Sequence, residues 1–285
     1  MSDLVGATRI TILVDNKAND GLLAEHGFSV WVEVAGRRLL FDTGQGPALA
    51  ANAGKLGVAL HAADTLVLSH GHYDHTGGVS LVIESAPSVR VFCHPAATTL
   101  RYSIRNGAAG PIGMPESASS ALERVPPERL HWTTKPIEIA PGIGLTGPIP
   151  RLGDYEDVGG PFFVDGEGKH SDPIDDDLAL WIPTDRGLVV VVGCSHAGVI
   201  NTLKYAHRLS GGSRIHAVLG GFHLGEASET RVARTMGALT ALGPDLIVPC
   251  HCTGELAVEK LRQTFGERVQ VGSAGATYTF DGDDR

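Results

Sequence analysis

The sequence predicts an α/β fold in which two β-sheets are each faced by helices. The first half of the chain holds several runs of β-branched and apolar residues, of which residues 8–14 are the clearest. The second half alternates apolar runs of strand length with runs of helical periodicity. No linker separates the halves, so we expect one domain over residues 1–285.

The expected elements of the first half follow from strand runs and turn residues. Asp15-Asn16 ends the first strand, and Ala35-Gly36-Arg37 turns the second strand into the third. A helix closed by Gly57 precedes the next strand. In order, we expect strands at 8–14, 27–34 and 38–44, a helix at 47–56, a strand at 65–68, a helix starting over 78–84 and a strand at 89–93.

Residues 101–135 differ in character from the rest of the chain. Gly and Pro interrupt this segment repeatedly, with a short helix-like run at 117–124. Connections this long are often binding loops, so we expect an insertion that acts as a lid. Arg101 and Arg105 within it are candidates for contact with an anion, with solvated arginine as the equal alternative.

After this insertion the chain forms short strands and then a regular alternation. Residues 153–177 read as an irregular acidic loop that ends in a solvated turn, Asp175-Asp176-Asp177. A hairpin over 178–192 follows. Beyond it, we expect helices at 199–209 and 228–242 and strands at 215–219 and 246–248.

Composition and charge exclude several classes of protein. With 285 residues, 42% of them hydrophobic, the chain can bury a large core, and no run of eighteen apolar residues predicts a membrane span. The N-terminus does not read as a secretory signal, and the four cysteines form no Cys-x-x-Cys pair, so we expect a reducing cytoplasm. A net charge of −9 argues against nucleic acid as a partner. The oligomeric state stays open.

One stretch carries most of the chemistry. A buried strand end at 66–68 leads into a loop that holds His70, His72, Asp74 and His75, closed by Gly77-Gly78. Three imidazoles and a carboxylate within six residues are not typical of a core or of a solvated surface, because buried polar groups need partners. The spacing indicates a metal-binding loop.

The spacing also suggests how the ligands divide. His70 and His72 lie two residues apart, so in an extended loop both rings face one cation. Asp74 and His75 are adjacent and are better placed for a second cation. Nitrogen and oxygen donors suit Zn²⁺, which we expect first, and Fe²⁺ or Mn²⁺ as alternatives. Two such ions can share a hydroxide, and this hydroxide can attack a substrate.

These four residues resemble the signature of the metallo-β-lactamase superfamily. The fuller string from Leu68 to Gly78 is similar to a narrower branch, often described as dihydropterin-type ribofuranosyl-aminobenzene 5'-phosphate synthases. The resemblance covers the chain from Thr8 to about Thr279, apart from the insertion. It implies a four-layer αββα sandwich, with Asp42-Thr43-Gly44 beneath the metal loop.

Each of the three last strands ends in a loop that carries a histidine, where layered α/β folds gather their ligands. The resemblance implies that His251 joins Asp74 and His75. The chain departs from the superfamily at two ligands: no histidine follows Gly147, and Gly193-Cys194 stands where relatives have Gly-Asp. We therefore expect Cys194 to replace the bridging carboxylate and His196 to supply the missing imidazole, with a buried apolar role as the alternative for Cys194.

Other candidates lie around this set. By analogy with phosphodiesterase relatives, His223 is the candidate acid or phosphate contact, with a helix-capping role as its alternative. His26 and Arg105 are candidate substrate contacts. Cys250 and Cys252 alternate around His251, so we expect both thiols to point away from the metals.

The leading hypothesis is a dinuclear metal-dependent hydrolase, in which a metal-bound hydroxide attacks a phosphoester, or less readily a lactone or thioester, of a small anionic molecule. Asp74 would orient the hydroxide and His223 would protonate the leaving group. The alternatives are a pterin-related synthase that forms a carbon–carbon bond with loss of pyrophosphate, a diiron redox enzyme, and a non-catalytic module that binds metal or ligand.

Overall fold

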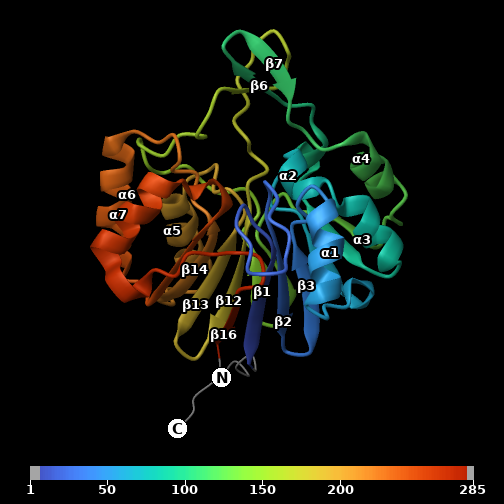
Figure 1. The fold of residues 1–285 in the computed structure, drawn as a ribbon, viewed down its shortest axis with the longest axis horizontal. Helices are drawn as coiled ribbons and strands as arrows, with labels where there is room; N and C mark the ends of the chain where they lie inside the picture. Colours follow the sequence, from blue (N-terminus) through green and yellow to red (C-terminus); the bar gives the residue numbers. More distant parts are fainter. Residues whose placement is uncertain (1–6, 281–285) are drawn as a thin grey trace.

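The computed structural model describes residues 7–280 and consists of two β-sheets packed face to face between two layers of helices (Figure 1). The αββα sandwich expected for the chain is thus confirmed. Within the described residues, no helix is long and apolar enough to cross a membrane.

The first sheet has seven strands in the order β16-β1-β2-β3-β4-β5-β8. Its first four strands pair antiparallel and its last four pair parallel, so that β3, β4, β5 and β8 end at the same edge. The strands are β1 (Thr8–Val14), β2 (Ser29–Val34), β3 (Arg37–Phe41), β4 (Thr65–Val67), β5 (Arg90–Cys93), β8 (Leu130–Trp132) and β16 (Thr277–Phe280).

The second sheet has six strands in the order β15-β14-β13-β12-β10-β9. Strands β13, β14 and β15 are parallel neighbours, which places the loops after them side by side. The strands are β9 (Ile137–Ala140), β10 (Ile143–Leu145), β12 (Ala179–Thr184), β13 (Gly187–Val192), β14 (Ile215–Gly221) and β15 (Leu246–Cys250).

Helices cover the outer face of each sheet (Figure 1). Those on the first sheet are α1 (Pro47–Lys55), α3 (Val79–Ser85) and α4 (Glu116–Glu123), and those on the second are α5 (Val199–Leu209), α6 (Glu229–Leu242) and α7 (Glu255–Phe265). A short helix, α2 (Tyr73–Thr76), and four 3₁₀ turns, η1 (Leu60–Ala62), η2 (Pro95–Thr98), η3 (His251–Thr253) and η4 (Gly266–Arg268), complete the helical elements.

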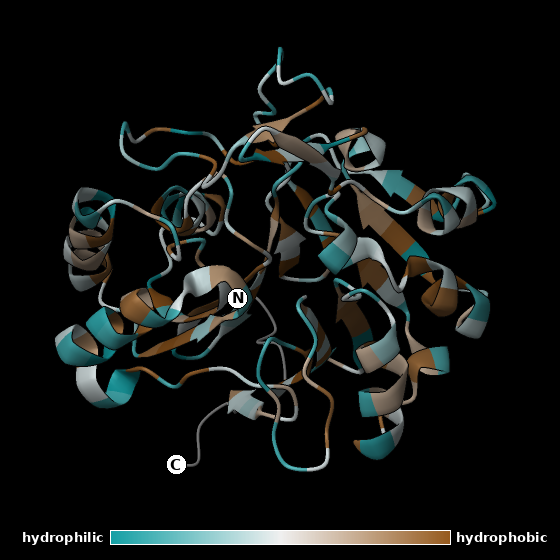
Figure 2. Ribbon diagram, turned by 45° about the horizontal axis from the view of Figure 1, so that its top comes forward, coloured by the Kyte–Doolittle hydropathy of each residue, from teal (hydrophilic) through white to brown (hydrophobic). Residues whose placement is uncertain are grey.

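Three apolar clusters hold these layers together. One lies between the sheets, and one lies between each sheet and its helices, as the brown strands and inner helix faces of Figure 2 indicate. Successive side chains of a strand point to opposite faces of the sheet and so enter different clusters. In β3, Leu39 and Phe41 enter the central cluster, whereas Leu40 packs toward α1. Burial on both faces explains why the strands read as continuous apolar runs.

The expected insertion at 101–135 divides into two parts. Strands β6 (Tyr102–Arg105) and β7 (Ala108–Pro111) project as a hairpin above the sandwich (Figure 1). Strand β6 also pairs with β11 (Phe162–Phe163), which completes a small third sheet. In contrast, α4 packs into the outer apolar cluster and β8 extends the seven-stranded sheet. Only the hairpin is separate from the sandwich, so the lid remains a prediction for that part.

Two expectations about charged residues are wrong. Arg101 is buried, and it pairs with two aspartates, Asp172 at 2.7 Å and Asp176 at 2.6 Å, rather than facing solvent or an anion. Asp176 and Asp177 are themselves fully buried, so Asp175–Asp177 is not a solvated turn. The polar composition of residues 153–177 suggested that the aspartates are exposed. Nothing in the sequence indicated that Asp176 pairs with Arg101, which lies 75 residues away along the chain.

Candidate metal centre

The candidate site lies where the strands of both sheets end, beneath the projecting hairpin (Figure 1). Strand β4 delivers the loop that carries His70 and His72. Helix α2 begins directly after His72 and carries Asp74 and His75 on its single turn. The change from extended loop to helix separates the motif into two pairs of ligands.

The second sheet supplies the facing side chains. Cys194 and His196 follow β13, His223 follows β14, and His251 follows β15. Ser195, His223 and His251 have φ angles of 55°, 47° and 48°, a left-handed conformation that is costly for residues with a side chain. The backbone thus leaves the extended conformation shortly after each of these three strands.

The inner ring atoms of these residues converge. His70 Nε2 lies 3.0 Å from His72 Nδ1, and His75 Nε2 lies 3.1 Å from the Cys194 sulfur. One possible ligand atom from each of His70, Cys194 and His196 lies within 4.8 Å of the others, and the same holds for His75, Cys194 and His251. Cys194 therefore belongs to both sets.

The opposite ring nitrogens of His70, His75 and His196 are held by protein groups. His70 Nδ1 faces the Ser69 hydroxyl at 2.9 Å, and His75 Nδ1 faces the Asp42 carboxylate at 2.7 Å. His196 donates from Nδ1 to the carbonyl oxygen of Val158 at 2.8 Å. Such contacts on the far nitrogen are typical of metal-bound histidines, because they fix the ring and leave the near nitrogen free to coordinate.

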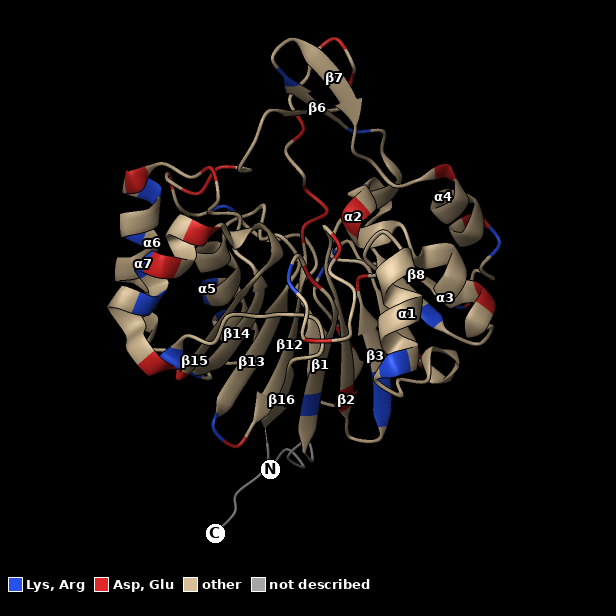
Figure 3. Ribbon diagram, in the orientation of Figure 1, with Lys and Arg blue, Asp and Glu red and all other residues tan. Residues whose placement is uncertain are grey.

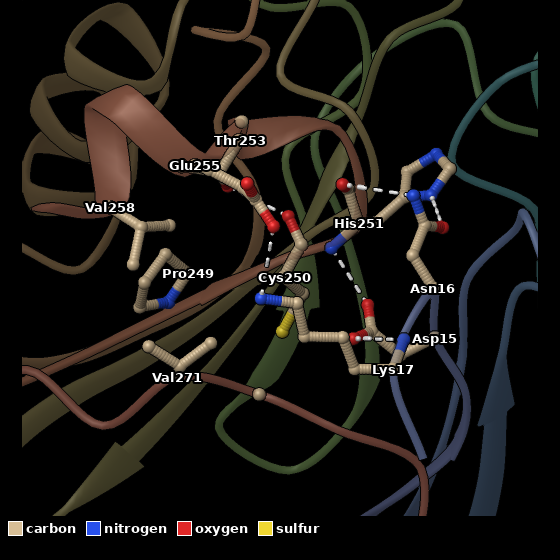
Figure 4. A pocket seen from close by; sticks show the side chains of 12 residues that line it. Asp15, Asn16, Lys17, Pro249, Cys250, His251, Thr253, Glu255, Val258 and Val271 are labelled. Atoms are coloured by element: carbon tan, nitrogen blue, oxygen red, sulfur yellow. Dashed lines mark hydrogen bonds and ion pairs between the residues drawn. The ribbon is translucent and has the colours of Figure 1, made fainter. Parts of the chain in front are cut away.

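His251 is held in the same way from the pocket behind it. Its backbone N–H donates to Asp15 at 2.7 Å, and its Nδ1 faces Asn16 Oδ1 at 2.9 Å (Figure 4). Its Nε2 lies 3.2 Å from Asp74. The ring thus points from the pocket wall into the site.

The donor set fits a metal centre. Over residues 7–280, no hydrogen-bond partner contacts the buried Nε2 of His196, although a buried polar atom without a partner is costly. Burial lowers the pKa of His72 to about 3, and burial together with neighbouring histidines lowers the pKa of His70 and His196 well below the ordinary value. Imidazoles held neutral keep the lone pair that coordination needs.

The pKa of Asp74 and the pKa of Cys194 are shifted in opposite directions. Burial alone would raise the pKa of Asp74, but His75 and the hydrogen bonds from His251 and His26 outweigh it and hold that pKa well below its usual range. Burial raises the pKa of the Cys194 thiol well above its usual range. A nearby cation would favour the Cys194 thiolate, so metal binding at this thiol would release a proton.

The structure places the remaining candidates at different distances from this cluster. His223 packs against His196 with ring centroids 4.4 Å apart and ring planes tilted by 47°, and half-exposed His26 lies 3.2 Å from Asp74 at the rim. Arg105 is on β6, and both of its terminal nitrogens donate to Glu226. A substrate contact by Arg105 would require this exposed pair to open, so that assignment stays a prediction.

One expectation about the site is wrong. Cys250 does point away, with its thiol buried against the Val248 carbonyl, but Cys252 lies with Cys194 and His223, one possible ligand atom from each within 4.8 Å. The expected alternation requires a strand, whereas β15 ends at Cys250 and η3 starts at His251. The chain turns there, so Cys252 returns to the site.

The resemblance placed Asp42 beneath the metal loop, where the structure has it, but sequence reasoning did not predict which groups orient the ligands. Asp42 accepts from the backbone and hydroxyl of Ser69 at 2.7 Å each, in addition to its contact with His75. Its φ of 59° suits the Asp-Thr-Gly turn, which was the available signal. Val158 contributes only a carbonyl oxygen, so its side chain gave no signal.

Comparisons with known proteins agree with this geometry. Residues 23–251 match the metallo-beta-lactamase superfamily. The chain is 30% identical over 283 residues to the 7,8-dihydropterin-6-methyl-4-(beta-D-ribofuranosyl)-aminobenzene-5'-phosphate synthase of Methanocaldococcus jannaschii, covering 92% of each chain. It is 35% identical over 256 residues to an uncharacterized protein of the same archaeon, covering 89% of this chain and 94% of that one.

A solved structure is similar to this chain in both fold and sequence. A metal-dependent hydrolase of the beta-lactamase superfamily superimposes with a TM-score of 0.79 at 32% identity, covering 95% of this chain and 98% of the other. The family match covers more than half of the chain, and it includes every predicted metal ligand from His70 to His251. The chain therefore belongs to the metallo-β-lactamase superfamily of metal-dependent enzymes.

Proposed function

We propose that this chain is a dinuclear metal-dependent hydrolase that cleaves a phosphoester of a small anionic molecule, in preference to a lactone or thioester. The observation that carries the proposal is the position of Cys194, whose sulfur is common to the set with His70 and His196 and the set with His75 and His251. A thiolate there can take the place of the carboxylate that bridges two ions in relatives.

Two divalent cations, with Zn²⁺ expected first, would activate a water molecule and withdraw negative charge from the ester during attack. His70, His72 and His196 would hold one ion, and Asp74, His75 and His251 the other, with Cys194 common to both. The chain's own groups then fix the geometry of the reaction.

We assign Asp74 the role of orienting the attacking water. Its Oδ2 lies 3.2 Å from both His26 and His251 and 3.9 Å from His75, which keeps the carboxylate ionised and its direction fixed. His26 is more than half exposed at the rim, where it can contact a substrate that approaches Asp74.

We assign His223 the protonation of the leaving group. Its ring packs against His196 and Phe162, and its pKa is raised: burial alone would lower it, but the neighbouring Cys252 outweighs that effect. A raised pKa favours the protonated imidazole, which is the form that a general acid requires. The preference for a phosphoester rests on this residue and on the phosphorylated product named for the archaeal synthase.

A synthase reaction is the second candidate, because a relative 30% identical to the chain carries that name. Such a reaction would join carbon to carbon with loss of pyrophosphate. No group described above is specific for that chemistry, whereas all of them suit water activation and leaving-group protonation.

The test is turnover by the metal-loaded chain on a panel of phosphomonoester, phosphodiester, lactone and thioester substrates. We expect hydrolysis of a phosphoester that is lost on chelation and restored by metal, and lost in His196→Ala but not in the surface control His170→Ala. Full metal content without hydrolysis of any ester would contradict the proposal. Pyrophosphate release from a dihydropterin diphosphate, only with an aminobenzene acceptor present, would favour the synthase.

A further inference from the structure

A second thiol, that of Cys252, lies beside the candidate centre and has no role in the proposed reaction. Cys252 forms a set with Cys194 and His223, with one possible ligand atom from each within 4.8 Å of the others. They follow β13, β14 and β15, three adjacent parallel strands. Their grouping is thus fixed by the sheet and not by one flexible loop.

Glycines leave room for both outer members of the set. A Cβ on Gly221 would lie 2.6 Å from the Cys252 sulfur, and a Cβ on Gly159 would lie 1.9 Å from the His223 ring. Real Cβ atoms do not approach that closely, so any other residue at either position would displace the thiol or the ring. The backbone here is shaped around these two side chains.

One ring nitrogen of His223 is held by the protein, and in the described part of the chain the other is left free to bind a ligand. Its Nε2 faces the Gly159 carbonyl oxygen at 3.2 Å, and since a carbonyl only accepts, Nε2 carries a proton. Its Nδ1 is buried and contacts no hydrogen-bond partner anywhere in residues 7–280. A histidine held through one nitrogen by a carbonyl, with the other nitrogen buried and unsatisfied, has the arrangement of a metal ligand.

We propose that Cys194, Cys252 and His223 form a third cation position, selective for thiophilic divalent ions such as Zn²⁺, Co²⁺ and Cd²⁺. Two thiolates and an imidazole are soft donors that favour these ions over Mg²⁺ or Mn²⁺. Binding displaces to solvent any proton that the two thiols or Nδ1 of His223 hold. A thiolate sulfur carries three lone pairs, so Cys194 can contact an ion here as well as in the dinuclear centre.

Occupation of this position has a consequence for turnover that rests on the proposed function. An ion on Nδ1 of His223 would prevent that ring from delivering a proton, and it would draw Cys194 toward Cys252. Thiophilic ions in excess should therefore inhibit the enzyme, whereas excess Mg²⁺ should not.

The binding itself is tested without measuring activity. The metal-free chain, kept reduced with a phosphine, is titrated with Co²⁺ while the near-ultraviolet charge-transfer absorbance between thiolate and cobalt is recorded. We expect absorbance in the wild-type chain to keep rising between the second and third equivalents, because Cys252 joins as a second thiolate. Cys252→Ala should stop at the second equivalent, and Cys252→Ser serves as an isosteric repeat if the alanine variant does not fold.

Cys93→Ala is the matched control, since it also removes one buried thiol but lies in β5 of the other sheet. It should keep the third equivalent. Saturation of the wild-type chain at two equivalents would overturn the third position and leave the dinuclear centre intact. A third equivalent with full charge-transfer absorbance in Cys252→Ala would also overturn it. Failure of the wild-type chain to take up any cobalt would overturn both proposals.

Discussion

The sulfur of Cys194 lies 3.1 Å from Nε2 of His75, although 119 residues separate them in the sequence. His75 comes from the helical turn of the first sheet's metal loop, and Cys194 comes from the end of β13 in the second sheet. The contact therefore joins the two halves of the sandwich at the candidate centre. Removal of either side chain should affect metal binding more than folding, because the apolar clusters hold the sheets.

Substitution of Cys194 tests the bridge. Cys194→Asp should keep about two metal ions per chain, because a carboxylate is the ligand that relatives use in a dinuclear site. Cys194→Ala should bind metal more weakly, since both sets then lose a donor. Elemental analysis after dialysis against metal-free buffer measures the content. Equal retention by wild type and Cys194→Ala would remove the thiol from the ligand set.

His196→Ala should lose metal and turnover together while the fold survives. The imidazole supplies the third nitrogen of the set with His70, but it is a polar side chain outside the three apolar clusters. Circular dichroism checks the fold, and elemental analysis checks the metal. Full metal content with reduced turnover would instead indicate that His196 acts on the substrate.

His223→Ala should lower turnover on esters with poor leaving groups by about 10²–10⁴. Alkoxides need a proton to depart and nitrophenolate does not, so the loss should be large for alkyl esters and small for nitrophenyl esters. Metal content at two equivalents should not change. An equal loss for both leaving groups, confined to KM, would contradict a role in protonation and indicate substrate binding.

Arg101→Ala should lower the free energy of unfolding by about 3–5 kcal/mol, because it leaves two buried carboxylates without their cation. Asp176 also accepts from the backbone N–H of Gly71, so the metal loop should loosen as well. Urea denaturation measures the change. Arg105→Ala, which breaks an exposed pair, is the control and should cost about 0–1 kcal/mol. Equal costs for the two variants would contradict the structural role of Arg101.

The sequence predicted the layers because the signal there is local. Apolar runs buried on both faces, such as that of β13, and the periodicity of α5 and α6 depend on neighbouring residues alone. The metal loop was likewise compact enough to recognise. Ligands from strand ends could be expected as a group, since parallel strands β13 to β15 end at one edge.

What the sequence could not predict depends on long-range contact or on a local break in regular structure. Cys252 was misplaced because the strand ends two residues earlier, with His251 in a left-handed conformation. Arg101 finds its buried partners more than seventy residues away. Gly and Pro residues in and before residues 116–132 led us to predict that this segment belongs to the insertion. Helix α4 instead packs on the first sheet, and β8 pairs with its edge strand β5.

Metal content tests the proposed centre most directly. The wild-type chain, purified without chelator, should contain about two transition-metal ions per chain by elemental analysis. Chelation should remove the ions together with phosphoester hydrolysis, and re-addition of Zn²⁺ should restore both. Purified chain that holds no transition metal, and takes up none on reconstitution, would contradict a dinuclear centre at His70, Cys194 and His251.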